Sequence, residues 1–359
     1  MSIIDIEIEE VRKLCENVVP NSKIIACTAG LVRVDIQRNQ LNRQVTVCIR
    51  FPVTYPNQHI LVELKSKTLS EKFLNRLVSL CEKKAQEHLG KTQCLPVLRF
   101  MQEYVQENPL CICFDEIQAL RKDLGSNASP EQLKLKQKTS AVILTAKIGA
   151  YFYRVKAIVP DDYPEKCVDL RQQETNLPAI LLRYLNGQSR EIARQCVEAP
   201  LRLTKGKTAR DFKPVPSLYK ALKFCLEATC AFPNEHCPVC ELVALPENPN
   251  DLEIDDSKDA YVERVYCGHL FHQGCLKLYL QEPPFPKYGK LCPARQRHVR
   301  SDTAYNLQGN ENLNTSKNEE CGTRLAHDRW VTNTKIAESR WAQKQARRRE
   351  LEEVVDFLK

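Results

Sequence analysis

The chain has 359 residues, of which 43% are hydrophobic and 27% charged, and its formal net charge is +8. This length predicts about two or three domains with packed cores, and so mild a charge argues against a nucleic-acid-binding protein, in which basic residues gather into a stripe. The chain begins with an acidic, helix-like segment, and no apolar run approaches about 18 residues, so we expect neither a signal peptide nor a membrane span.

Residues 1–107 are predicted to form a first domain. Apolar residues recur at helical spacing from Ile4 to Cys15, which predicts an N-terminal helix. Alternating apolar and polar residues then predict three strands, at residues 32–36, 45–51 and 60–64. Two helices follow, near residues 74–85 and 97–105.

Residues 108–232 repeat this plan and are predicted to form a second, diverged domain. A helix is expected near residues 117–124, and a long one over 179–197 with an interruption at Asn186 and Gly187. Between them, alternation predicts strands at residues 142–148, 153–159 and 168–170. A basic connector at 205–216 leads to a last helix near 218–226.

A short motif marks the same place in both domains. Pro52, Tyr55 and Pro56 close the second predicted strand of the first domain, and Pro160, Tyr163 and Pro164 close that of the second. Proline fixes its own φ and restrains the residue before it, so both motifs predict stiff turns. Their shared spacing and strand context indicate a duplication.

This order of helix, strand meander, Tyr-Pro turn and trailing helices resembles the RWD domain, a relative of the ubiquitin-conjugating fold whose turn reads YPxxxP. Ile60 and Val168 stand where its last proline would be. The resemblance implies two tandem RWD-like domains that contact partner proteins. Because neither has the His-Pro-Asn segment of conjugating enzymes, we expect Cys81 and Cys196 to be buried structural cysteines.

The C-terminal third contains cysteines and histidines at the spacing of metal ligands. A two-residue gap lets both sulfurs of a turn reach one ion at about 2.3 Å, and a structural zinc ion takes four thiolate or imidazole donors. Two quartets therefore predict two closed zinc sites. The candidate ligands are Cys237, Cys240, Cys267, His269, His272, Cys275, Cys292 and Cys321.

The rest of the 17 cysteines lie mostly in apolar periodic stretches, where a reduced cysteine acts as a small hydrophobic residue. A secreted chain would need them paired, and their total is odd. The sequence therefore predicts a reducing compartment, the cytoplasm, the nucleus or both.

The stretch HCPVCELV…VYCGHLFHQGCLKLYLQE…LCPA resembles a RING-H2 finger, here over residues 235–327. The resemblance implies interleaved zinc sites. The first would take Cys237, Cys240, His272 and Cys275, and the second Cys267, His269, Cys292 and an eighth ligand. The loop between Cys240 and Cys267 is long, acidic and without ligands, and we expect it to be an exposed excursion.

The finger departs from the family pattern at its end. A RING finger ends in C-P-x-C, but arginine occupies position 295. Removal of residues 295–320 would restore C-P-A-C at Cys321, so Cys321 is the predicted eighth ligand, with His298 as the alternative. The polar, asparagine-rich residues 295–320 are then a flexible insertion or a retained intron.

The RING resemblance implies an E3 ubiquitin transferase that forms no covalent ubiquitin–cysteine intermediate. It would bind a ubiquitin-loaded conjugating enzyme in an apolar groove, and its RWD-like domains would bind a protein substrate or complex. The implied groove residues are Val239, Leu276, Tyr279 and Pro293, with Arg324 as a basic linchpin. Leu276 and Tyr279 are also compatible with the core of a short helix.

The layout is similar to that of the Fanconi anaemia ubiquitin ligase, and also to ligases with one RWD domain before a RING. The alternative function is a non-catalytic zinc-binding adaptor. After the finger, Leu351, Val354, Val355 and Leu358 predict an amphipathic helix within residues 330–359, either packed on the body or bound to a partner. The predicted fold class is therefore α+β: two RWD-like domains, a RING finger and a C-terminal helix.

Overall fold

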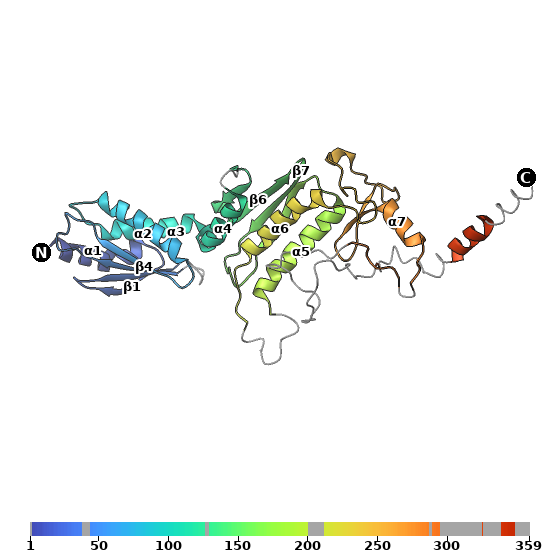
Figure 1. Cartoon of the computed structure of the whole chain (residues 1–359). Coiled ribbons are helices and arrows are strands. Elements are labelled where there is room, and N and C mark those ends of the chain that lie inside the picture. The colour runs from blue at the N-terminus through green and yellow to red at the C-terminus, as the bar shows by residue number, and fades with distance from the viewer. Residues whose placement is uncertain are drawn as a thin grey trace, which may run out of the picture. The chain divides into compact units, whose positions relative to one another are not determined.

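The structure, a computed structural model, describes residues 2–37, 44–125, 129–199, 212–286, 289–294, 325 and 339–348. The described chain is α+β, as predicted, with two four-stranded sheets and a small two-stranded one (Figure 1). Its contacts divide it into two compact units. The first comprises Met1–Ala146, Tyr153–Thr175 and Leu185–Glu227, and the second Lys147–Phe152, Asn176–Tyr184 and Ala228–Lys359. The four domain boundaries expected from the sequence stay predictions.

The N-terminal part is an antiparallel meander covered by helices. Its strands are β1 (Ser22–Cys27), β2 (Val32–Gln37), β3 (Gln44–Arg50) and β4 (Leu61–Lys65), paired in that order. Its helices are α1 (Ile3–Val18), α2 (Glu71–Gln86) and α3 (Cys94–Glu107). The apolar stripes of the helices and the inward residues of the strands form one core, as the periodicity predicts.

The sequence predicted three strands for this sheet, and the structure has four. The strand that was not predicted is β1. It is an edge strand, and Cys27 is its one fully buried residue. An edge strand with little burial leaves a weak alternation in the sequence.

The second sheet has the same strand order as the first. After η1 (Pro109–Cys113) and α4 (Phe114–Leu124) come β5 (Leu133–Lys136), η2 (Gln137–Thr139), β6 (Ala141–Ile148), β7 (Tyr151–Ile158) and β8 (Asp169–Thr175). The sheet order is β5-β6-β7-β8, and helices α5 (Ala179–Val197) and α6 (Leu218–Ala231) follow it. The repeated plan is thus confirmed in the order of elements, although β5, another edge strand, was not predicted.

A carboxylate from an earlier helix holds the start of the last helix in each repeat. Glu7 of α1 accepts hydrogen bonds from the backbone N–H groups of Gln93 and Cys94, where α3 begins. In the second repeat, Glu116 of α4 accepts one from the N–H of Tyr219, 2.9 Å away, at the start of α6. A negative charge at a helix N-terminus satisfies free N–H groups and complements the helix dipole.

Helix α5 runs unbroken through Asn186 and Gly187, so the predicted interruption is wrong. The Asn186 side chain accepts a 2.8 Å hydrogen bond from the Tyr153 hydroxyl and donates one of 2.7 Å to Gln172. Because its polar atoms are engaged with the sheet, they do not compete for the backbone of the helix.

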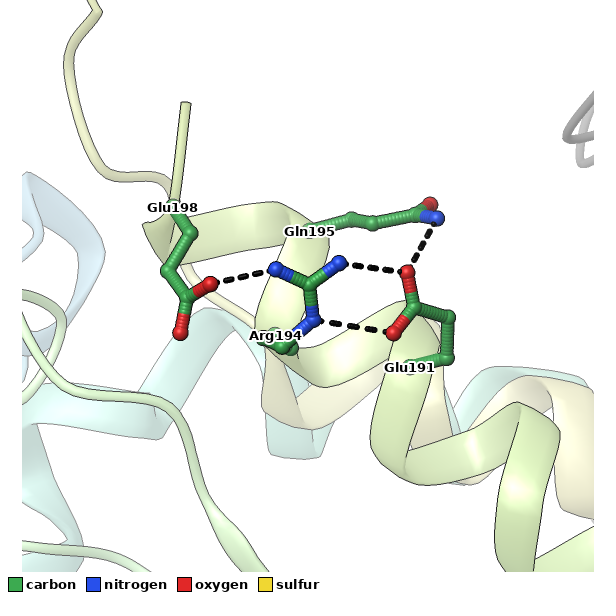
Figure 2. Close-up of polar contacts among 4 residues, drawn as sticks. All are labelled: Glu191, Arg194, Gln195 and Glu198. Atoms are coloured by element: carbon green, nitrogen blue, oxygen red, sulfur yellow. Dashed lines mark hydrogen bonds and ion pairs between the residues drawn. The ribbon is translucent and has the colours of Figure 1, made fainter. Parts of the chain in front are cut away.

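The C-terminal turns of α5 carry a network of charged side chains (Figure 2). Arg194 donates two hydrogen bonds to the carboxylate of Glu191, of 2.9 and 2.7 Å, and a third to Glu198. Gln195 also donates to Glu191, at 2.8 Å. These residues lie three and four positions apart, the spacing at which helix side chains meet.

The C-terminal part contains η4 (Phe232–Asn234), η5 (Pro249–Asp251), the antiparallel strands β9 (Val262–Arg264) and β10 (Leu270–His272), and α7 (Gln273–Gln281). Its small core unites ligand cysteines with apolar residues of these elements. The buried members are Cys237, Val265, Phe271, Leu276, Leu280, Cys292 and Ala294.

The acidic loop before β9 is more ordered than the sequence suggested. The backbone N–H groups of Gln273 and Gly274 donate to the carbonyls of Tyr261 and Asp259, at 2.8 and 3.0 Å, and so tie the loop to the start of α7. Within the same unit, the Tyr151 hydroxyl donates a 2.7 Å hydrogen bond to the carbonyl of Pro246. The loop is therefore an exposed excursion only in part.

Residues 339–348 are helical, whereas the apolar stripe predicted at Leu351–Leu358 lies outside the described residues. In the part of the chain that the structure describes, every helix is too short or too polar to cross a lipid bilayer.

Candidate metal centre

The first group of ligands joins a turn to a helix start. Cys237 and Cys240 lie on the turn after η4, which is closed by hydrogen bonds of 2.8 Å from the Cys237 N–H to the carbonyl of Leu242 and from the Glu241 N–H to the carbonyl of Cys237. His272 is the N-cap of α7, and Cys275 lies in its first turn. The four ligating atoms all lie within 4.8 Å of one another.

The second group is built on the β9–β10 turn. Cys267 and His269 flank Gly268, whose φ of +91° is a left-handed conformation that glycine adopts without steric cost. The third member, Cys292, comes from the segment after α7, and the three ligating atoms also lie within 4.8 Å of one another. Cys292 is fully buried and His269 is 5% exposed, so the site is closed to solvent on these sides.

The spacing of the donors fits a tetrahedral ion. Sulfur at about 2.3 Å and nitrogen at about 2.0 Å from one zinc ion would lie about 3.6 Å apart. In the first group, Nδ1 of His272 lies 3.3 Å from Sγ of Cys240 and 3.9 Å from Sγ of Cys275. In the second, Nδ1 of His269 lies 3.2 Å from Sγ of Cys267 and 3.6 Å from Sγ of Cys292. Both groups can therefore hold a metal ion.

The packing of the donors favours the thiolate form at Cys237 and Cys267, whereas burial and then the Cys240 thiol raise the pKa of Cys275 to about 12. The Cys292 thiol and then the His269 ring stabilise the thiolate of Cys267 and, against its burial, lower the pKa of Cys267 to about 4. Burial raises the pKa of Cys237, but hydrogen bonds from His272 and backbone N–H groups outweigh it and lower that pKa to about 6. Thiolate is the form of cysteine that ligates metals.

The two groups interleave along the chain. Cys237 and Cys240 meet His272 and Cys275, while Cys267 and His269, which lie between these pairs, meet Cys292 instead. Each ligand pair therefore shares a site with the ligands after the next pair along the chain, and not with the next pair itself. Two ions bound in this way would cross-link the whole module rather than close two separate loops.

The predicted eighth ligand, Cys321, lies outside the described residues, as do its alternative His298 and the predicted linchpin Arg324. The nearest described residue is Leu325. Its backbone N–H donates a 2.9 Å hydrogen bond to the carbonyl of Lys290, and its side chain packs on the core that contains Cys292. The chain thus returns to the module four residues after position 321.

The four predicted groove residues differ in exposure. Val239 is 37% exposed, and Pro293 is partly exposed. Tyr279 is half-buried, and its hydroxyl donates a 2.9 Å hydrogen bond to the carbonyl of Leu291. Leu276 is 1% exposed and belongs to the core. This is the alternative that the sequence left open for Leu276, the core of a short helix, and the groove roles of these residues stay predictions.

Exposed apolar residues that the sequence reasoning missed lie beside Val239 and Tyr279. Leu278 is 58% exposed, Leu242 66% and Leu291 41%. The exposure of Leu278 could have been predicted from the spacing of Leu276 and Leu280. Residues four apart share one helix face, so a buried pair at 276 and 280 turns position 278 outward.

The cysteines near the Tyr-Pro turns are buried, as predicted. Burial raises the pKa of the Cys81 thiol to about 12, and it also raises the pKa of Cys196. Neither thiol ionises at neutral pH, so neither is an activated nucleophile.

A scan of the sequence against protein-family models finds no match, and a search of curated proteins finds none either. The geometry of the metal centre and of the surface around it therefore carries the functional argument.

Proposed function

We propose that the protein is a RING-type E3 ubiquitin ligase. The observation that carries this proposal is the interleaving of the two Cys/His groups, which is the ligand arrangement of a RING finger. The ligase would bind a ubiquitin-loaded conjugating enzyme through the zinc module. It would hold a protein substrate or complex through the two helix-covered sheets, the parts that resemble RWD domains. The cysteines that the structure describes are in the thiol rather than the disulfide form, which suits a protein of the cytoplasm or nucleus.

Zinc is the metal that the donor set favours. Thiolate and imidazole donors in a tetrahedral arrangement select zinc over magnesium or calcium, which take oxygen ligands. Cys321 is the proposed eighth ligand, and the return of the chain at Leu325 supports it. A zinc ion in either site would shape the module and would leave the chemistry of transfer to the conjugating enzyme.

The proposed docking surface joins the first metal turn to helix α7. Val239 projects from the turn and Leu278 from the helix, and the two elements meet at the ligands His272 and Cys275. A few apolar anchors in such a patch carry most of the energy of an interface. The ligase would act by holding the ubiquitin thioester in a reactive orientation, so its contribution is positional.

The test is the release of ubiquitin from a preloaded conjugating enzyme to free lysine, over a panel of such enzymes. Val239→Arg places a charge in the proposed apolar patch and is expected to slow release by about tenfold or more. Val53→Arg is the matched control, because Val53 is fully exposed in the N-terminal part of the chain. Zinc content should be equal in both variants.

The same assay separates the ligase from the adaptor. An adaptor would bind its partners through the same module but would release no ubiquitin from any conjugating enzyme in the panel. If zinc-loaded protein releases no ubiquitin from any conjugating enzyme in the panel, the adaptor is the better description and the ligase proposal fails.

A further inference from the structure

A groove of about 790 Å³ lies within the second compact unit, which also contains the metal ligands. One wall is the segment that opens α5, with Leu177, Pro178 and Leu182. The other is the acidic loop, with Leu252, Ile254 and Tyr261. Its size is within the range of about 300–1,000 Å³ that ligand sites occupy.

A large apolar side chain that lines the groove is exposed to solvent. Ile254 is 89% exposed, whereas Ala244 and Leu245, earlier in the same long loop, are buried. An exposed large aliphatic side chain beside an apolar cavity marks a surface suited to a partner.

The loop that forms one wall of the groove is strongly acidic. The loop segment 247–256 carries five carboxylates, those of Glu247, Asp251, Glu253, Asp255 and Asp256, and no lysine, arginine or histidine. Lys258 neutralises one of them, with its Nζ 3.0 Å from Glu253. No basic residue lines the groove. This charge repels nucleic acids and anionic membranes and attracts basic polypeptides.

Hydrogen bonds hold the acidic loop in shape. The N–H of Asp255 donates to Glu253 at 3.2 Å, and the N–H of Ser257 donates to Asp255 at 2.9 Å, so the backbone on either side of Ile254 is fixed. Lys277 of α7 donates a 3.0 Å hydrogen bond to the carbonyl of Ser257. A preformed wall loses little conformational entropy on binding.

The opposite wall is held in the same way. Asn176 accepts a 2.8 Å hydrogen bond from the N–H of Phe152 and donates one of 2.7 Å to the carbonyl of Ala150. The Leu177 side chain that follows is buried. Both walls belong to one compact unit, which also contains the metal centre.

We propose that this groove binds a peptide segment in which lysine or arginine residues flank one large apolar side chain. The apolar side chain contacts Ile254 and the α5 wall, and the basic side chains lie toward the loop carboxylates. If the protein is a ligase, this groove selects its substrate, a role that rests on the function proposed above. Peptide binding itself does not depend on that function.

The experiment measures fluorescence anisotropy of three labelled peptides with full-length, zinc-loaded protein. The peptides are GKRKLSKRKG, a version with serine in place of the leucine (GKRKSSKRKG) and an acidic version (GEEELSEEEG). The first is expected to bind at least about tenfold more tightly than either of the others. Raising the salt from about 0.1 M to about 1 M shortens the Debye length from about 10 to about 3 Å and should weaken its binding.

Variants assign the binding to the groove. Ile254→Ser and the pair Glu247→Lys with Asp251→Lys should each weaken binding of the first peptide by about tenfold. All three side chains are exposed, so folding should be retained. Glu16→Lys with Glu107→Lys is the matched control, because it makes the same change in charge at exposed positions of the N-terminal part.

Each outcome decides the proposal. Equal binding of the three peptides, or equal loss in the groove and control variants, overturns it. Binding that appears only in Lys344→Glu with Arg347→Glu would make the chain's own basic helix the occupant and would also overturn it. If the groove variants lose the peptide but release ubiquitin from the conjugating enzyme at the normal rate, both proposals stand. If the peptide binds in the groove but ubiquitin is never released, the groove stands and the ligase proposal fails.

Discussion

At the scale of single residues, the Tyr163 hydroxyl forms hydrogen bonds with one side chain and two backbone N–H groups. Its hydroxyl donates a 2.6 Å hydrogen bond to Glu116 and accepts from the N–H groups of Ser217 and Leu218, at 2.8 and 3.1 Å. The side chain is 1% exposed, and burial raises the pKa of both Tyr163 and Glu116. The hydroxyl therefore links the Glu116 carboxylate to the buried start of α6.

Tyr163→Phe should therefore destabilise the second sheet by about 1–3 kcal/mol, since it removes the acceptor of the buried Ser217 N–H. Hydrogen exchange of the amides at Ser217 and Leu218 measures the loss directly. Tyr219→Phe is the matched control. It removes an exposed hydroxyl bonded to Asp123, so its effect on the same amides should be small. Equal protection in Tyr163→Phe and the wild type would contradict the role given to this hydroxyl.

At the scale of elements, helix α7 is held at its C-terminal end by a buried lysine. Nζ of Lys290 donates to the carbonyls of Tyr279 and Glu282 and lies 4.5 Å from the centre of the Tyr279 ring. A cation at this end of a helix satisfies its last carbonyls and complements its dipole. Burial lowers the pKa of Lys290, because charge is less stable away from water.

Lys290→Met keeps the length of the side chain and removes its donors. We expect a loss of about 1–3 kcal/mol in the stability of the module and slower ubiquitin release, since α7 carries Leu278. Thermal unfolding of zinc-loaded protein, followed together with zinc release, measures the first effect. Lys65→Met, at an exposed position of β4, should leave both measurements unchanged. An equally small effect in Lys290→Met would show that the lysine is dispensable.

The same scale shows what the sequence could predict. The apolar stripe from Ile4 to Cys15 predicted α1, because a helix that buries one face has apolar residues at helical spacing in its sequence. The metal ligands were predictable from short gaps, and the structure brings seven of them into two groups. The contact of Tyr151 with Pro246 was not predictable, because it joins residues 95 positions apart and has no periodic signal. Edge strand β1 was missed because its sequence, SKIIAC, does not alternate, and β5 because LKLK alternates over only four residues.

At the scale of the whole molecule, the candidate ligands among the described residues lie between positions 237 and 292, in the C-terminal module, and none belongs to the core of the N-terminal sheet. Chelation should therefore unfold the module and leave the N-terminal sheet folded. Hydrogen exchange before and after removal of the metal would show lost protection in α7 and β10 but retained protection in β2 and β3. Protection of α7 that survives complete chelation would mean that the small core folds without metal, against the expectation for so thin a core.

The number of bound ions tests whether the two halves of the module close on each other across residues 295–320. Zinc ligation at a closed site contributes on the order of 10 kcal/mol, whereas closing a long loop costs only a few kcal/mol, so distance along the chain is no barrier to Cys321 as a ligand. Native mass spectrometry should find two zinc ions in the wild type and one in Cys321→Ser. Cys230→Ser, on α6 outside both groups, is the control and should keep two. Two ions in Cys321→Ser and one in His298→Ala would instead make His298 the eighth ligand, and the chain would then close its second site before the stretch from 299 to 320 rather than after it.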